Sequence, residues 1–183
     1  QEILSNANNT PTFGRLPHAR AEGIAALLEV LQTRGGKREN LYEVAQALQF
    51  GTDDLLPIVD AASLLCFITV NEGDIELTED GKRFAAADIL TRKHLFRVRL
   101  LACAPFARKI HEALVQQPRH VLSEEFFEDI LDEHFTQNET EQQMDTVIDW
   151  GRYAELFEYD ATRGVLMLSQ PEINQPEASP TAP

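Results

Sequence analysis

The sequence predicts a mainly α-helical protein with small β-hairpins, arranged as two tandem winged-helix-like units. Apolar residues recur at helical spacing along most of the chain. In addition, the order helix, helix, aspartate-bearing helix and hairpin occurs twice. The turn of the first hairpin lies at residues 71–74, and that of the second at residues 160–164. Three helices closed by a hairpin form the outline of a winged helix.

The first copy begins with a predicted helix over residues 20–34, which ends at the glycine pair 35–36. Its inward positions recur at helical spacing: Ile24, Leu27, Leu28 and Leu31. Asn40 is expected to cap a short second helix, and Thr52 a third. Because Pro57 lies within the first two turns of the third helix, we expect an irregularity there.

The first hairpin is predicted to consist of two short strands, over residues 67–70 and 75–77. Thr78 is expected to cap a further helix over residues 79–87. A strongly apolar helix over residues 91–104 then connects the two copies, and Pro105 starts the next helix. The apolar residues of the connecting helix are Leu95, Phe96, Val98, Leu100 and Leu101.

In the second copy, Ser123 is expected to cap a helix over residues 124–134. The apolar stripe of this helix is predicted to be Phe126, Phe127, Ile130 and Leu131. The last helix extends to Glu155, and two capping boxes are available to it: Thr136 with Glu139, or Asn138 with Glu141. The final hairpin closes the second unit.

Composition along the chain divides it into four segments. We expect a linker over residues 1–15 and a first winged-helix-like unit over residues 16–90. The connecting helix and the second unit are expected over residues 91–169. Residues 170–183 are rich in proline and lack a periodic apolar pattern, which predicts a disordered tail.

Charge and cysteine content exclude several classes of protein. The net charge of −14 over 183 residues argues against nucleic acid as a partner, since phosphate binding needs a basic surface. No apolar run approaches the length of a membrane span, so direct membrane insertion is not expected. Cys66 and Cys103 lie in apolar stretches, which predicts buried thiols in a reducing compartment; a disulfide or a reactive thiol is the alternative.

Catalytic and cofactor motifs are not found in the sequence. It contains neither GxxxxGK[ST] nor GxGxxG, and the run Gly35-Gly36-Lys37 follows a predicted helix and is interpreted as a helix stop. The histidines and cysteines show no metal-ligand spacing. We therefore predict no catalytic residue, no cofactor, no metal site and no enzyme activity. The acid pairs over residues 124–129 are interpreted as a solvated helix face, with acid–base chemistry or a cation site as the alternative.

Charge is distributed unevenly over the second half of the chain. Residues 92–120 are rich in Lys and Arg, whereas residues 123–145 carry many carboxylates and no Lys or Arg. Two solvated faces that partly neutralise each other explain this pattern. Alternatively, one of the faces binds another chain.

The candidate functional site is the run from Asp149 through Trp150, Arg152 and Tyr153. Trp, Arg and Tyr within four residues are typical of a binding hot spot, and Gly151 would permit the close approach of another backbone. Asp149 could also bond to Arg152 or Tyr153 one helical turn away. In the structural alternative, Trp150 and Tyr153 fill the core while Asp149 pairs with Arg152.

A winged helix most often reads DNA with its third helix. The first copy has aspartates and no Lys or Arg in this helix, and Arg152 is the one basic side chain in the second. Phosphates would repel such acidic helices. DNA binding is therefore not expected, although a winged-helix transcription regulator remains an alternative function, as does a small-molecule sensor.

Six short runs carry a resemblance to a known family. They are AEGIAALLE at 21–29, LYEVA at 41–45, DDLLPIVDA at 53–61, GDIELT at 73–78, RKHLF at 92–96 and DWGRYAE at 149–155. Together, across about residues 16–169, they resemble the AAA-associated C-terminal domain of the ATP-binding subunits of nitrate, sulfonate, taurine and bicarbonate-type ABC importers.

This resemblance implies a regulatory or assembly domain with a nucleotide-binding domain upstream of Gln1. It implies a cytoplasmic location, peripheral to the inner membrane through the transporter. The implied partners are the nucleotide-binding domain and the membrane subunit of the transporter, with a homodimer as a further arrangement. Because the chain has no Walker motifs, ATP hydrolysis does not carry over to it.

Overall fold

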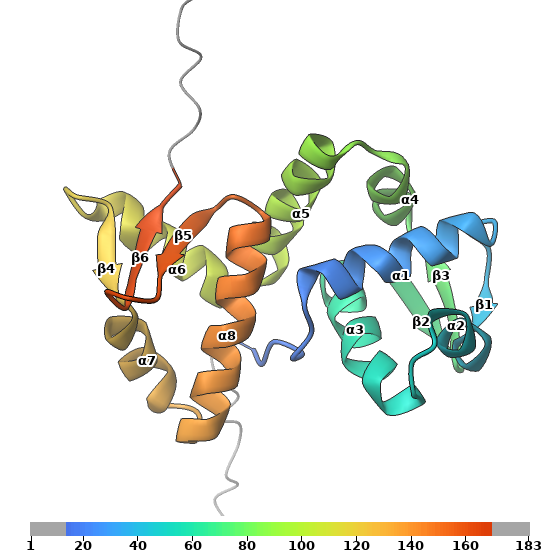
Figure 1. The fold of residues 1–183 in the computed structure, drawn as a ribbon, viewed down its shortest axis with the longest axis horizontal. Coiled ribbons are helices and arrows are strands. Elements are labelled where there is room, and N and C mark those ends of the chain that lie inside the picture. The colour runs from blue at the N-terminus through green and yellow to red at the C-terminus, as the bar shows by residue number, and fades with distance from the viewer. Residues whose placement is uncertain (1–13, 170–183) are drawn as a thin grey trace, which may run out of the picture.

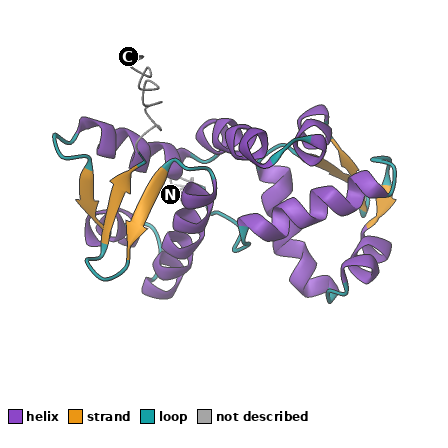
Figure 2. Cartoon of the chain, turned by 45° about the horizontal axis from the view of Figure 1, so that its top comes forward, coloured by secondary structure: helices purple, strands orange, loops and turns teal. Residues whose placement is uncertain are grey.

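Residues 14–169 are described by a computed structural model, which contains eight helices and two separate three-stranded sheets (Figure 1). The predicted mainly α-helical fold with small hairpins is therefore confirmed. The predicted tail lies outside the described residues, as does the predicted linker up to residue 13. The two sheets lie at opposite ends of the molecule, with helices between them (Figure 2).

The first group of elements contains three helices and a sheet in the strand order β1-β3-β2. Its helices are α1 (Ala21–Thr33), α2 (Leu41–Leu48) and α3 (Thr52–Leu64), and its strands are β1 (Glu39–Asn40), β2 (Ile68–Asn71) and β3 (Asp74–Leu77). Helix α4 (Glu79–Ala86) follows the sheet, and α5 (Ile89–Cys103) leads to the second group.

The second group repeats this order, with the strand order β4-β6-β5. Its helices are α6 (Pro105–Gln116), α7 (Glu124–Asp132) and α8 (Gln137–Tyr153), and its strands are β4 (Val121–Ser123), β5 (Phe157–Asp160) and β6 (Val165–Leu168). Each predicted hairpin is joined by a third, antiparallel strand that was not predicted. Strands β1 and β4 are too short to show a period of two residues.

Most of the expected helix caps are present. Asn40, Thr78 and Ser123 each accept a backbone N–H bond at the start of a helix, and Thr136 forms the full capping box with Glu139. The prediction for Thr52 is wrong: the extended residue before α3 is Gly51, and Thr52 is the first helical residue. Helix α3 is continuous through Pro57, which is its sixth residue, although proline lacks the N–H that would bond to the carbonyl of Asp53.

The buried apolar residues form one connected core, and Phe96 of α5 lies where the two groups meet. Its ring lies 6.2 Å from the ring of Phe67 in the first group and 6.2 Å from that of Trp150 in the second. Phe126, which was predicted to belong to an apolar stripe, is 46% exposed, and Val98 of the connecting helix is 47% exposed. Within residues 14–169, about half of each residue is left open to solvent.

Helix α5 binds the C-terminal ends of both third helices. Arg99 donates from Nε to the carbonyl oxygen of Leu65, at 3.0 Å, and Arg97 donates from Nε to that of Ala154, at 2.9 Å. Leu65 and Ala154 are the C-caps of α3 and α8, whose last carbonyls lack partners within the helix. The basic residues 92–120 were interpreted as a solvated face, but two of them, Arg97 and Arg99, bind backbone carbonyls within the fold.

The two cysteines are not the buried thiols that the sequence predicted. Cys66 is exposed and Cys103 is half-buried, and both are free thiols. Cys66 follows the end of α3, where the backbone turns with a φ of 60°. The apolar residues beside it are buried, but this turn leaves Cys66 at the surface.

Candidate functional site on helix α8

The four candidate residues lie on the last two turns of α8 and point in different directions. Trp150 is fully buried, Asp149 and Tyr153 are half-buried, and Arg152 is exposed. Successive residues of a helix are rotated by about 100°, so a four-residue run cannot present all its side chains to one surface. The structure therefore divides the predicted hot spot between the interior and a groove.

Trp150 and Tyr153 pack against α5. The indole of Trp150 lies edge-on to the ring of Phe96 and donates from Nε1 to the carbonyl oxygen of Ala19, at 2.8 Å. The ring of Tyr153 is 4.9 Å from that of Phe96, and its burial raises the pKa of the phenol. Both aromatic residues therefore contribute to the core, as the structural alternative expected.

Asp149 does not form the predicted bonds with Arg152 or Tyr153. Instead, its Oδ2 accepts a hydrogen bond from the backbone N–H of Ala21, at 2.7 Å, and its Oδ1 lies 3.4 Å from Arg20 Nη1. Ala21 is the first residue of α1, whose own N-cap residue makes no side-chain cap. Asp149 therefore caps α1 from the opposite half of the molecule, where the helix dipole favours a negative charge.

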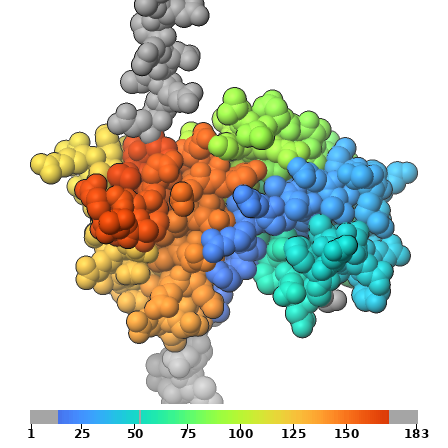
Figure 3. Space-filling model, in the orientation of Figure 1, coloured from blue at the N-terminus to red at the C-terminus, as the bar shows by residue number. Residues whose placement is uncertain are grey.

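Other side chains of α8 bind the chain that leads into α1, which we call the leading segment (residues 15–21, the last of which is the first residue of α1). Gln143 accepts from the backbone N–H of Leu16 at 2.7 Å and donates to its carbonyl oxygen at 2.9 Å. Thr146 Oγ1 lies 2.9 Å from His18 Nδ1. Together with the bonds to Ala19 and Ala21, these contacts form a clasp between the leading segment and α8, visible where blue meets orange in Figure 3.

Gln143 and Thr146 were not among the predicted site residues. Both are buried polar side chains, 5% and 2% exposed. With Trp150, they recur at intervals of three and four residues and so share one face of α8. The signal in the sequence was the presence of polar residues at positions spaced like core residues. A buried polar side chain requires a hydrogen-bond partner, so such residues indicate a contact with another segment.

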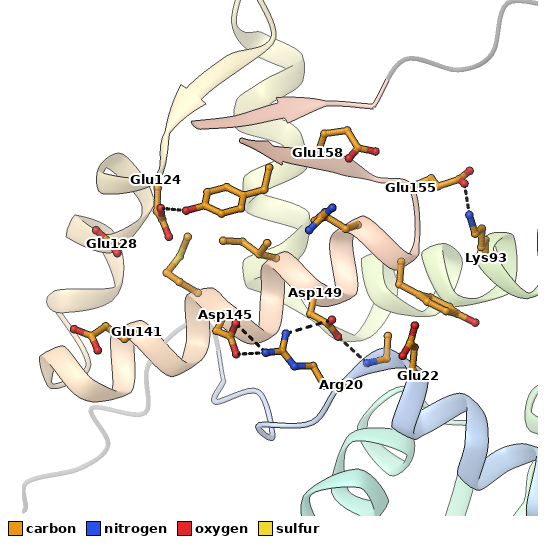
Figure 4. A pocket seen from close by; sticks show the side chains of 16 residues that line it. Arg20, Glu22, Lys93, Glu124, Glu128, Glu141, Asp145, Asp149, Glu155 and Glu158 are labelled. Carbon is orange, nitrogen blue, oxygen red and sulfur yellow. Dashed lines mark hydrogen bonds and ion pairs between the residues drawn. The ribbon is translucent and has the colours of Figure 1, made fainter. Parts of the chain in front are cut away.

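A groove of about 660 Å³ opens on the other side of α8, between the start of α1, helix α7 and strand β5 (Figure 4). We call it the acidic groove. Its eight carboxylate residues are Glu22, Glu124, Glu128, Glu141, Asp145, Asp149, Glu155 and Glu158. Its basic residues are Arg20, Lys93 and Arg152. Carboxylates thus outnumber cations, and this excess sets the electrostatic character of the groove.

Two of the three cations are already paired. Arg20 Nη2 lies 3.2 Å from Asp145 Oδ2, and Lys93 pairs with Glu155. Within residues 14–169, the Arg152 side chain makes no hydrogen bond and no ion pair. Of the four candidate residues, Arg152 is therefore the one available to another molecule.

Uncompensated negative charge gathers at the α7 end of the groove. Burial raises the pKa of Glu128, and the neighbouring carboxylates of Glu124 and Asp132 raise it further. Glu124 also accepts a hydrogen bond of 2.6 Å from the Tyr159 hydroxyl, which raises the pKa of Tyr159 to about 12. Charge of this kind suits the binding of cationic groups.

Gly151 makes room for an aromatic ring. A Cβ atom at this position would lie 2.1 Å from Cζ of Phe157, which belongs to β5. A close approach of another backbone was expected at Gly151, but the neighbour is a side chain of the following hairpin. Gly151 therefore serves the packing of α8 on its own sheet.

Neither a metal site nor a membrane-spanning helix is found in the described residues. No group of three or more His, Cys, Asp or Glu side chains among residues 14–169 is placed to hold a metal ion. Over the same residues, no helix combines the length and the apolar character needed to cross a membrane.

Comparison with known proteins identifies a family. A family model described as the C-terminal AAA-associated domain matches residues 42–160, which is more than half of the chain. No curated protein and no solved structure matches the chain. The matched range includes α8 and most of the acidic groove, whereas the leading segment and α1 precede it.

Proposed function

Because the chain belongs to the C-terminal AAA-associated domain family, we propose that it regulates or assembles the ATP-binding subunit of an ABC importer. The importer would be of the nitrate, sulfonate, taurine or bicarbonate type, and the chain would have no catalytic site of its own. It would act at the cytoplasmic face of the inner membrane, through the transporter. The observation that best supports this proposal is the clasp between the leading segment and α8.

The clasp provides a route for regulation. An ATPase domain on the N-terminal side would be joined through the leading segment, which is bound to α8 and continues directly into α1. The orientation of that domain would then be coupled to both groups of elements at once. A partner that binds one orientation more tightly would shift the population of the paired ATPase domains toward it.

Arg152 is the residue through which a partner would be recognised. It is exposed and without a partner in the described residues, and it belongs to a groove whose other charges are mostly negative. A surface with both signs of charge selects a partner with the complementary arrangement. The nucleotide-binding domain and the membrane subunit are the proposed partners.

The proposal is tested in the reconstituted importer with Arg152→Ala. An exposed ion pair contributes up to about 1 kcal/mol, so the ATPase rate should change by about two- to fivefold. Arg163→Ala is the matched control, because Arg163 is exposed in the β5–β6 turn and does not line the groove. An importer whose ATPase rate, transport and assembly are unchanged when residues 14–169 are deleted would refute the proposal.

The acidic groove supports a second candidate function, the sensing of a small cationic solute. Its volume of about 660 Å³ lies within the range of ligand pockets. A solute that binds the folded chain would raise its melting temperature, and the stabilisation would grow with the logarithm of the ligand concentration above the Kd. A thermal-shift screen of amines and guanidinium compounds would detect such binding as a rise in melting temperature that is smaller in the Glu128→Gln variant. An unchanged melting temperature with every compound would exclude it.

A further inference from the structure

Cys66 and Cys103 are neighbours in space although 37 residues separate them in the sequence. Their sulfur atoms lie 3.9 Å apart. Cys66 follows the C-terminus of α3, and Cys103 is the last residue of α5. Both are free, and Cys66 is exposed, so a reagent in solution can reach the pair.

The backbone at Cys66 is unusual for a cysteine. The backbone N–H of Cys66 donates to the carbonyl oxygen of Ser63, and the backbone N–H of Phe67 donates to that of Ala62. This pair of hydrogen bonds ends α3 in a Schellman motif. In this motif the residue in the position of Cys66 is left-handed and is usually glycine; here φ is 60°. A thiol therefore occupies a strained position beside a second thiol, and residues in such conformations cluster at functional sites.

Arg99 contacts both sides of the pair. Its Nη2 lies 3.3 Å from Cys103 Sγ, and its Nε donates to the carbonyl oxygen of Leu65. Burial raises the pKa of the Cys103 thiol, as does the neighbouring Cys66, and the positive charge of Arg99 acts in the opposite direction. Exposure favours Cys66 as the first thiol to react, and Arg99 favours the Cys103 thiolate once a proton has left.

We propose that Cys66 and Cys103 are a redox-sensitive pair that forms a reversible intramolecular disulfide by exchange with a low-molecular-weight disulfide such as oxidised glutathione. A disulfide requires an S–S distance of about 2 Å. Rotation of the two side chains can shorten the present separation, since Cys66 is exposed and its side chain is not enclosed. In a reducing compartment, the pair would remain as two thiols until the glutathione pool becomes oxidised.

The exchange takes place in two steps. The Cys66 thiolate attacks one sulfur of oxidised glutathione, which forms a mixed disulfide and releases one glutathione thiolate. The Cys103 thiolate then attacks Cys66 Sγ, forms the intramolecular bond and releases the second glutathione thiolate. The two protons lost by the cysteines are taken up by these thiolates, so two cysteines are oxidised and one glutathione disulfide is reduced to two thiols.

The disulfide would change one of two equivalent contacts of α5. In the second group, the residue in the position of Cys66 is Glu155, which also has a positive φ and pairs with Lys93 of α5. Oxidation would make the contact between α3 and α5 covalent and leave the contact between α8 and α5 polar. This inference rests on the thiol geometry alone and does not depend on the proposed partner.

The test uses the purified chain treated with oxidised glutathione. We expect both free thiols to be lost, the mass to fall by two hydrogens, and a peptide containing Cys66 to be linked to one containing Cys103 within a monomer. Dithiothreitol should restore both thiols, and the melting temperature should be several degrees higher in the oxidised form because the crosslink restricts the unfolded chain.

Single substitutions separate this pair from two unrelated thiols. Cys103→Ser should stop the reaction at a glutathione adduct on Cys66, and Cys66→Ser should react much more slowly. Circular dichroism would establish that both variants are folded. Glutathione adducts on both cysteines of the unsubstituted chain, a disulfide between two chains, or no reaction would each overturn the proposal.

Discussion

Adjacent residues of α8 have distinct structural roles. Trp150 is fully buried and bonded to Ala19, so Trp150→Ala should reduce the free energy of unfolding by about 3–5 kcal/mol. Trp150→Phe should cost less, about 1–3 kcal/mol, because a ring remains while the Ala19 carbonyl loses its donor. Urea unfolding of the two variants measures both values. Equal losses would mean that the ring adds nothing beyond the hydrogen bond, and would contradict the packing role of the indole.

Asp149 should affect stability through α1, not through its own helix. Asp149→Ala removes the cap of α1 and should cost about 0.5–2 kcal/mol, whereas Asp149→Asn keeps an acceptor and should recover most of the loss. Arg152→Ala, on the same helix, should cost at most about 1 kcal/mol. Comparison of the three melting curves tests this order. A loss at Arg152 as large as that at Asp149 would show that Arg152 has a structural partner.

At the residue scale, the sequence predicted the packing of Trp150 and Tyr153 better than it predicted the partner of Asp149. The segment around Trp150 was recognised, but the bond from Asp149 was assigned to Arg152 three residues away. The true partner, Ala21, is 128 residues distant and offers only a backbone N–H. Every non-proline residue carries such a group, so a contact of this kind leaves no mark in side-chain identity.

At the scale of elements, the acidic end of α7 makes stability depend on pH. Because the folded state raises the pKa of Glu128 above 4.5, the folded protein binds this proton more tightly than the unfolded chain. The stability from that proton is fully present below pH 4.5 and is lost as the pH rises through the folded pKa. Glu128→Gln should therefore gain stability relative to the parent between pH 4 and pH 7, by about 1 °C in melting temperature.

The matched control for this prediction is Asp129→Asn. Asp129 is exposed on the same helix and does not line the acidic groove. Its melting temperature should run parallel to that of the parent across the same pH range. A pH dependence that is equal in the two variants would mean that the charge of α7 as a whole, and not the position of Glu128, sets the effect.

Helices and most of their caps were predictable because both signals are local. Asn40, Thr78 and Ser123 cap the helices that the periodicity indicated. Strands β1 and β4 were missed since each has two or three residues and is defined by a partner far along the chain. The role of the basic residues in α5 was missed for the same reason: Arg97 and Arg99 bond to backbone carbonyls of other helices.

For the whole molecule, the continuous core predicts cooperative unfolding. Phe96 contacts aromatic rings of both groups, and the clasp joins α1 to α8. Calorimetry should therefore give one transition whose calorimetric and van't Hoff enthalpies agree. Two resolved transitions would show that the groups at either end unfold independently despite the shared helix α5.

The repeat indicated the architecture of each group but not how the groups are joined. Hydrophobic periodicity identifies the inward face of a helix without naming the element that covers it. The leading segment illustrates this limit, because its bonds to Gln143 and Trp150 depend on the final placement of α8. The polar residues Gln143 and Thr146, on a face of α8 that has the spacing of core residues, were the indication that a backbone segment packs on that face.

The clasp also has a mechanical consequence. The leading segment and α8 run in the same direction, since Leu16 bonds to Gln143 and Ala19 bonds to Trp150. Tension applied at residue 14 along this direction would strain these bonds together, in shear, so several must break at once. Tension applied across it would peel them apart one after another. The hold of α8 on the leading segment is thus stiff along α8 and compliant across it, so a pull at residue 14 would be transmitted in one direction and would release the segment in the other.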